Sequence, residues 1–211
     1  MSTPLRAFLL VAILTTAASA FAQVNIVNFD FGAVPVQCPS WGFTYQGAVL
    51  TCNYPVTQNF DDSPGFGWKM GSVIATPGSP SNTGAGISGP DSFICPPSFV
   101  GMPFNQAVLL QNVGSFVWQT VGGFSPGSYT LSFYLGSRCP AGWWDGDQTV
   151  TALIDGIAIG TWTLTSSAPF TLQTANFTVS TGGTHVLAFV GERQGDHTAF
   201  LSYVTITPTR R

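Results

Sequence analysis

Residues 104–138 read FNQAVLLQNVGSFVWQTVGGFSPGSYTLSFYLGSR, and this stretch decides the fold class. Its three segments are short, rich in β-branched and aromatic residues, and separated by glycine and proline turns, as antiparallel strands are. In the last segment apolar side chains take every second position, at Tyr129, Leu131, Phe133 and Leu135. Alternate side chains of a strand point to opposite faces, so this strand is expected to bury one face and to carry Tyr134 on the other.

The second half of the chain continues this pattern. The dipeptide Asp155-Gly156 favours a two-residue hairpin turn between two strands within residues 148–165. Further strands are predicted within 170–180, 184–192 and 198–207. We therefore predict an all-β fold, a single jelly-roll β-sandwich of about ten antiparallel strands with long loops at one end.

The first half of the chain is less regular. Residues 24–31 alternate and are predicted as a strand, and residues 65–76 contain another strand candidate. Residues 76–91 are rich in glycine, serine and proline and are predicted as a long surface loop. Neither a helical period nor an internal repeat is evident, so residues 23–211 are expected to form one domain.

Residues 1–22 have the pattern of a cleaved secretory signal. One cation, Arg6, precedes the apolar run AFLLVAIL, and small residues at Ala20 and Ala22 end the segment. An uncleaved membrane anchor is the alternative, but the apolar run is shorter than the roughly 20 residues that span a bilayer. We expect a secreted protein, extracellular or periplasmic, with no membrane insertion after signal cleavage.

The charge balance argues against a nucleic-acid partner. Without residues 1–22 the chain keeps five basic and nine acidic side chains, because only Arg6 is lost. Binding to nucleic acid depends on many lysines and arginines that neutralise phosphates. No basic patch of that kind can form here.

The four cysteines are Cys38, Cys52, Cys95 and Cys139, an even number that suggests two disulfides in an exported chain. Three pairings are possible. We favour Cys38 with Cys52, which closes a short local loop, and Cys95 with Cys139, which ties a proline-rich loop to the segment after Ser137. No metal site is predicted, because the chain has no C-x-x-C and its two histidines lack zinc-site spacing.

Several of these phrases resemble the galactose-binding-like jelly-roll superfamily, which includes many carbohydrate-binding modules and plant cell-wall β-sandwich proteins of uncharacterised type. They are a Gln-Thr-Val strand at 119–121, a Pro-Gly turn before Tyr-x-Leu-x-Phe at 129–133, the Asp155-Gly156 hairpin and the closing strand at 198–207. The resemblance covers residues 24–207 and supports the fold more strongly than a function.

The resemblance also implies a structural calcium between the first and last strands, held by an early glutamate and a late aspartate. Here Gly32 and Ser202 stand at those two positions. Calcium requires several oxygen ligands, carboxylates among them. We therefore do not expect the family calcium site, and Asp30 is interpreted as a hydrogen-bonded strand residue rather than as a lone ligand.

The segment GSRCPAGWWDGDQTV at 136–150 is the candidate carbohydrate site. Sugar binding needs flat aromatic faces and a few directed hydrogen bonds. The predicted contacts are Arg138, Trp143, Trp144 and Asp145, with Tyr134 extending the surface and Asp147 and Gln148 offering further donors and acceptors. Alternatively, one tryptophan closes the end of the sandwich and residues 145–147 form a turn.

The other tryptophans are weaker candidates. Trp41 and Trp68 lie among glycines and are interpreted mainly as packing residues under loops, although a binding role stays open. Trp118 and Trp162 fall within strand patterns and are interpreted as sheet residues, with the face of Trp118 left undetermined.

An enzymatic function has little support in the sequence. Glu192 is the only glutamate, and the polar stretch 191–197 is interpreted as a solvated loop. The nucleophile elbow, the phosphate loop and HExxH are absent from the sequence. We expect a non-catalytic protein without a cofactor that binds a cell-surface or environmental polysaccharide. The alternative is a structural or adhesive envelope protein that contacts other proteins through its sandwich surfaces.

Overall fold

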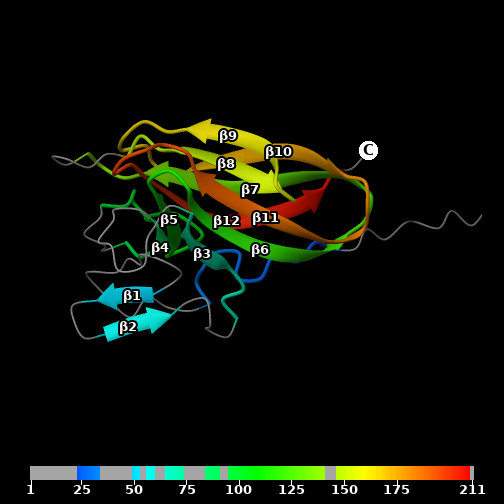
Figure 1. Cartoon of the computed structure of the whole chain (residues 1–211), viewed down its shortest axis with the longest axis horizontal. Coiled ribbons are helices and arrows are strands. Elements are labelled where there is room, and N and C mark those ends of the chain that lie inside the picture. The colour runs from blue at the N-terminus through cyan, green and yellow to red at the C-terminus, as the bar shows by residue number, and fades with distance from the viewer. Residues whose placement is uncertain are drawn as a thin grey trace, which may run out of the picture.

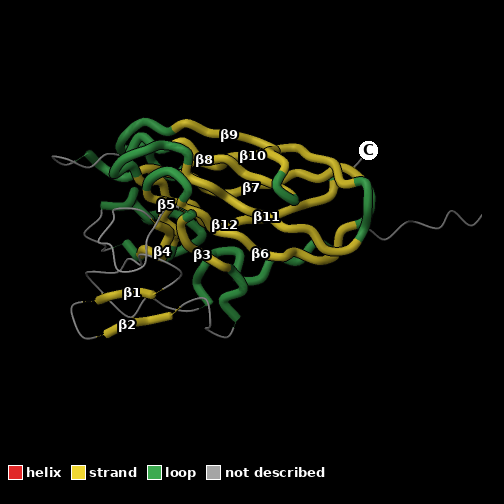
Figure 2. The backbone as a smooth tube through the Cα atoms, in the orientation of Figure 1, coloured by secondary structure: helices red, strands yellow, loops and turns green. Residues whose placement is uncertain are grey.

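The computed structural model describes residues 23–33, 49–52, 56–59, 65–73, 84–90, 95–140 and 146–209. Within these ranges every regular element is a strand, and two five-stranded sheets form a sandwich (Figures 1 and 2). All strand pairs in the two sheets are antiparallel. The all-β sandwich of about ten antiparallel strands is therefore confirmed. In the same ranges no helix has the length and apolar character needed to cross a membrane.

One sheet has the strand order β10-β7-β12-β5-β4. Its strands are β4 (Gly84–Ser88), β5 (Ala107–Gln111), β7 (Gly127–Ser137), β10 (Thr171–Val179) and β12 (Thr198–Pro208). The other sheet has the order β3-β6-β11-β8-β9. Its strands are β3 (Lys69–Ser72), β6 (Ser115–Phe124), β8 (Thr149–Ile154), β9 (Ile157–Thr163) and β11 (Gly183–Gly191). A separate pair, β1 (Val49–Cys52) and β2 (Val56–Asn59), lies beside the sandwich in Figure 1.

The core lies between the two sheets and follows the predicted alternation. In β7 the four apolar residues Tyr129, Leu131, Phe133 and Leu135 are at most 1% exposed. The β6–β7 turn is held by Tyr129, whose hydroxyl donates to Ser125 O at 2.7 Å and accepts from Ser125 N–H at 2.9 Å. Asp155 and Gly156 form the predicted β8–β9 turn with φ values of 50° and 80°, as a type I′ turn requires.

The predicted strand at 24–31 is wrong. Asn25 forms an isolated bridge with Gly122, and residues 27–30 form a turn. Beyond the bridge, the side-chain amide of Gln119 replaces ladder pairing, because it accepts from Val27 N–H at 2.8 Å and donates to Val27 O at 2.9 Å. Val24 and Phe31 near the two ends of this segment are both buried, so the segment packs on the core without forming a strand.

The predicted surface loop at 76–91 is also wrong in part. Residues 84–88 form β4, which pairs with β5 at the edge of its sheet. Ala85 and Ile87 are fully buried in the core. The sequence pattern did not reveal this strand, because glycine and serine at the intervening positions are typical of loops.

The connections differ in length between the two ends of the sandwich. Residues 125–126, 155–156 and 180–182 make short turns at one end. The opposite end carries the longer connections 164–170 and 192–197 together with the described ends of the β7–β8 connection, residues 138–140 and 146–148 (Figure 1). This loop-bearing end includes the segment that sequence analysis proposed as the carbohydrate site.

Candidate functional site

The connection between β7 and β8 leaves the sandwich and returns to it at adjacent points. Gly146 packs so closely on Arg138 that a Cβ atom there would lie 1.9 Å from the Arg138 carbonyl oxygen. Trp143, Trp144 and Asp145 fall between these two residues and lie outside the described residues. We call residues 139–145 the tryptophan segment.

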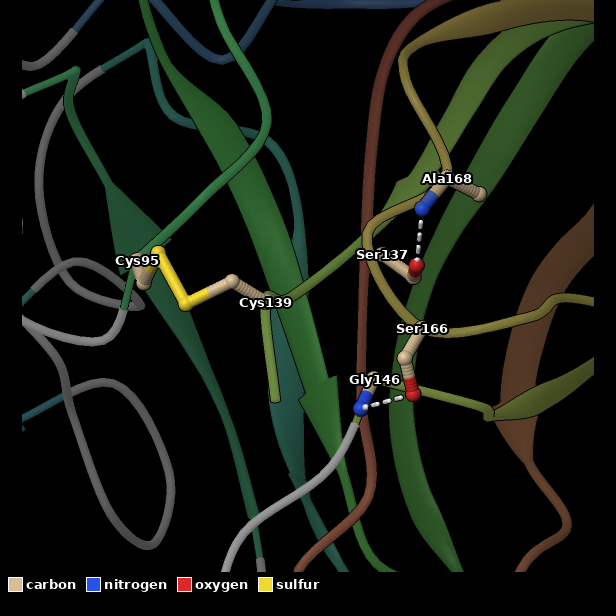
Figure 3. The surroundings of a disulfide bond; sticks show 6 residues. All are labelled: Cys95, Ser137, Cys139, Gly146, Ser166 and Ala168. Carbon is tan, nitrogen blue, oxygen red and sulfur yellow. Dashed lines mark hydrogen bonds between the residues drawn. A yellow bond between two sulfur atoms is a disulfide. The ribbon is translucent and has the colours of Figure 1, made fainter. Parts of the chain in front are cut away.

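The first end of the tryptophan segment is fixed by the Cys95–Cys139 disulfide (Figure 3). This bond is one of the two predicted pairs, and Cys139 N–H also donates to Cys95 O at 3.3 Å. Just before it, Ser137 Oγ accepts from Ala168 N–H at 2.8 Å and lies 2.6 Å from Thr165 O. The strand end that leads into the segment is therefore held from two sides.

The second end is fixed through Gly146, Asp147 and Gln148. Gly146 N–H donates to Ser166 Oγ at 3.4 Å, as Figure 3 shows. Asp147 Oδ2 pairs with Arg193 Nη1 at 2.7 Å, and its Oδ1 contacts His197 Nδ1. Buried Gln148 donates to His197 O at 2.9 Å and accepts from Arg193 N–H at 2.7 Å. These contacts tie the end of the segment to the β9–β10 and β11–β12 connections.

Arg138 is buried rather than on the surface. Its side chain is 1% exposed and pairs with Asp196 Oδ1 at 2.7 Å. The same guanidinium also contacts Asp196 O, and Gln111 Nε2 contacts the Asp196 carboxylate. These bonds join the ends of β7 and β5 to the β11–β12 loop.

Tyr134 is placed elsewhere. It lies on the outer face of the β10-β7-β12-β5-β4 sheet, half-buried, with its ring centroid 5.5 Å from Phe104 and 6.2 Å from Tyr203. Gly136 separates it from Arg138, and Pro97 covers Gly136 on that side. The structure therefore does not bring Tyr134 and Arg138 to one surface.

The polar surface beside the segment comes from Asp147, which the sequence offered as a donor or acceptor, and from Arg193 and His197, which the sequence placed in a solvated loop. Side chains of Asp147, His197 and Arg193 are 24%, 21% and 45% exposed, so each reaches solvent. The polar composition of residues 191–197 was the sequence feature that could have indicated Arg193 and His197 as part of this surface. The solvated-loop interpretation holds for exposed Glu192 and Gln194, while Asp196 and His197 face inward to Arg138 and Asp147.

The region of the family calcium site contains a hydrogen-bonded serine. Buried Ser202 Oγ lies 2.8 Å from Gln106 O and 3.2 Å from Asp30 O. Asp30 lies in a turn rather than a strand, where its carboxylate accepts from Gly32 N–H at 3.0 Å. In the described part of the chain, no group of three acidic, histidine or cysteine side chains could hold a metal ion.

The other tryptophans and cysteines that the sequence singled out are either packed in the sandwich or lie outside the described residues. Trp68 is fully buried against Phe31, and its Nε1–H donates to Asn28 O at 3.0 Å, so a binding role for Trp68 is wrong. Trp162 packs edge-on against Phe133 at 4.9 Å, as a sheet residue. Trp41, Cys38 and the side chain of Cys52 lie outside the described residues, and the Cys38–Cys52 pairing stays a prediction.

Neither the known family models nor the curated proteins include a match to this sequence. Solved structures do resemble the fold. A cyclase from Fischerella sp. TAU, in complex with 4-(1H-indol-3-yl)butan-2-one, is 16% identical with a TM-score of 0.56, over 90% of this chain and 99% of the cyclase.

Two further likenesses are more distant. The K1 adhesin domain of Lys-gingipain from Porphyromonas gingivalis W83 is 14% identical with a TM-score of 0.49, over 72% of this chain and 96% of that domain. A family 35 carbohydrate-binding module from Clostridium thermocellum is 14% identical with a TM-score of 0.40, over 52% of this chain and 82% of the module. At 16% identity, the likeness to the cyclase shows the fold alone.

Proposed function

We propose that the protein is an exported, non-catalytic carbohydrate-binding protein that recognises a cell-surface or environmental polysaccharide at its loop-bearing end. The observation that carries this proposal is the contact between Arg138 and Gly146, with a disulfide on one side and the Asp147 ion pairs on the other. A segment with two adjacent tryptophans thus starts and ends at fixed points. Fixed attachment lowers the entropy lost when such a segment binds a ligand.

The chemistry of the surrounding groups suits a polyhydroxylated ligand. Indole rings cover the C–H face of a sugar, and that is the role we assign to Trp143 and Trp144. Arg193, Asp147 and His197 are partly exposed polar side chains next to the segment. We propose that they, together with Asp145, bind the sugar hydroxyls.

Arg138 and Tyr134 take different roles in this proposal. Because Arg138 is buried and paired with Asp196, we assign it as a positioning residue that holds the base of the site. Tyr134 extends the binding surface only for a polysaccharide long enough to pass from the loops onto the outer sheet face.

The test is retention of the mature chain, residues 23–211, in native gels that contain soluble polysaccharides. We expect at least one polysaccharide to retard the wild type, and Trp143→Ala/Trp144→Ala to migrate as in a gel without polysaccharide. Trp118→Ala is the matched control, because it removes a tryptophan from the outer face of the other sheet. If the wild type and the double variant are retarded equally, the proposed site is wrong. If no polysaccharide retards the wild type, the proposed function is wrong.

A further inference from the structure

The outer face of the β3-β6-β11-β8-β9 sheet contains an open groove of about 520 Å³. Apolar side chains line most of it. Its lining is Val73, Gly114, Phe116, Trp118, Leu153, Gly156, Val186, Ala188 and Val190. Trp118 and Val186 are each 37% exposed. The face of Trp118, which sequence left undetermined, is thus the outer one.

Register explains why this sheet face is hollow. Ala188 in β11 pairs with Trp118 in β6 on one side and with Leu153 in β8 on the other. Directly paired residues of neighbouring strands point to the same face. A one-carbon side chain therefore lies between two large ones, and the row dips at Ala188.

The outer faces of the two sheets differ in how far other side chains cover them. The apolar outer face of the β10-β7-β12-β5-β4 sheet is covered by Phe99, Met102, Phe104 and Phe170, and Phe104 and Phe170 are 6% exposed. On the groove side, Val73 at the rim is 76% exposed. Within the described residues, the groove is the apolar sheet surface that stays open.

The lining chemistry defines what can bind. None of the nine residues carries a charge, and the only polar side-chain atom among them is the indole nitrogen of Trp118. A charged or many-hydroxyl ligand would lose its hydration here without new hydrogen bonds, at a cost of a few kcal/mol or more. For a neutral apolar molecule, transfer from water into the groove is favourable.

Size decides between a small molecule and a protein. The volume of about 520 Å³ lies inside the range of small-molecule sites, roughly 300–1,000 Å³. A protein partner would have to contact many residues beyond these nine, because each side of a stable protein interface contributes roughly 20–30 residues. We propose that this groove binds a neutral, largely apolar small molecule, seated over Ala188 against Trp118.

The experiment uses the neutral fluorescent probe N-phenyl-1-naphthylamine with the mature chain. We expect probe emission to rise on binding, and Ala188→Phe, which fills the hollow, to lower the affinity at least about tenfold. Ala188→Asp should do the same by adding a charge. The anionic probe 8-anilinonaphthalene-1-sulfonate should bind at least about tenfold more weakly than the neutral probe.

Leu172→Asp is the matched control, because Leu172 is a 57% exposed leucine on the other sheet and should leave probe binding unchanged. Trp143→Ala/Trp144→Ala should also bind the probe as the wild type does, so this site and the carbohydrate site fail independently. Equal affinity of folded Ala188→Phe and wild type overturns the proposal. It is also overturned if light scattering shows a dimer that Ala188→Asp dissociates, since a second copy then covers the groove.

Discussion

His185 Nδ1 lies 2.5 Å from Asp155 Oδ2, and this pair joins β11 to the β8–β9 turn at the end opposite the tryptophan segment. The other carboxylate oxygen of Asp155 accepts from Val186 N–H at 2.8 Å. The hydrogen bond with Asp155 raises the pKa of His185 above 6.5, and the hydrogen bond with His185 lowers the pKa of Asp155 below 3.8. Both shifts favour the charged pair in the folded state.

The pair predicts a pH optimum for stability. The raised His185 pKa stabilises the fold below about pH 6.5, and this contribution is lost as pH rises through the folded pKa. The lowered Asp155 pKa stabilises the fold above about pH 3.8, and this contribution is lost as pH falls through the folded pKa. We expect urea unfolding to give a higher free energy of unfolding at pH 5.5 than at pH 8.

Asp155→Asn isolates this pair, because asparagine tolerates the positive φ of the turn and can still accept from Val186 N–H. Asp155 is 48% exposed, so the expected loss at pH 5.5 is only about 0.5–1 kcal/mol. At pH 8 the variant should approach the wild type. Parallel pH profiles of the two proteins would contradict the assignment.

The Cys95–Cys139 disulfide predicts a link between redox state and polysaccharide binding. It joins residues 44 positions apart, and a bond of that kind contributes about 2–4 kcal/mol. We expect Cys95→Ser/Cys139→Ser to lower the free energy of unfolding by that amount and to weaken retention in polysaccharide gels. Unchanged unfolding would show that the bond does not form in the mature protein.

Strand periodicity was sufficient to predict most of the fold. The alternation in β7 survives because one face of each strand must be buried, and the β8–β9 hairpin follows from the conformational preference of Asp155-Gly156. It failed where side chains replace backbone pairing, as Gln119 does for Val27. It also failed at β4, whose Ala85 and Ile87 are buried among glycines.

The candidate site was predictable in composition and not in contacts. Sequence showed that Arg138 and Asp147 are near the two tryptophans along the chain. It did not show that the β11–β12 loop returns to them, because Asp196 is 58 residues from Arg138. That long-range contact turns Arg138 from a surface candidate into a buried ion-pair partner.

Gly146 predicts how tightly the tryptophan segment must close. A methyl group in Gly146→Ala would meet the Arg138 backbone, with the nearest atom 1.9 Å away, so one end of the segment must move. We expect a loss of about 1–3 kcal/mol, as for other overpacked sites, and weaker polysaccharide retention. Gly89→Ala is the matched control because no atom lies within 4 Å of its Cβ position. Equal thermal stability of both variants would refute this closure.

The Arg138–Asp196 ion pair allows a direct test of whether Arg138 is a positioning residue. Arg138→Met leaves the Asp196 carboxylate, 13% exposed, without its charged partner, and breaking such a pair costs about 3–5 kcal/mol. Adding Asp196→Asn removes the remaining charge and should restore part of that loss. Arg193→Met is the control, because Arg193 is 45% exposed and its pair should contribute less than about 1 kcal/mol. If urea unfolding gives Arg138→Met and Arg193→Met the same loss, Arg138 is not a positioning residue.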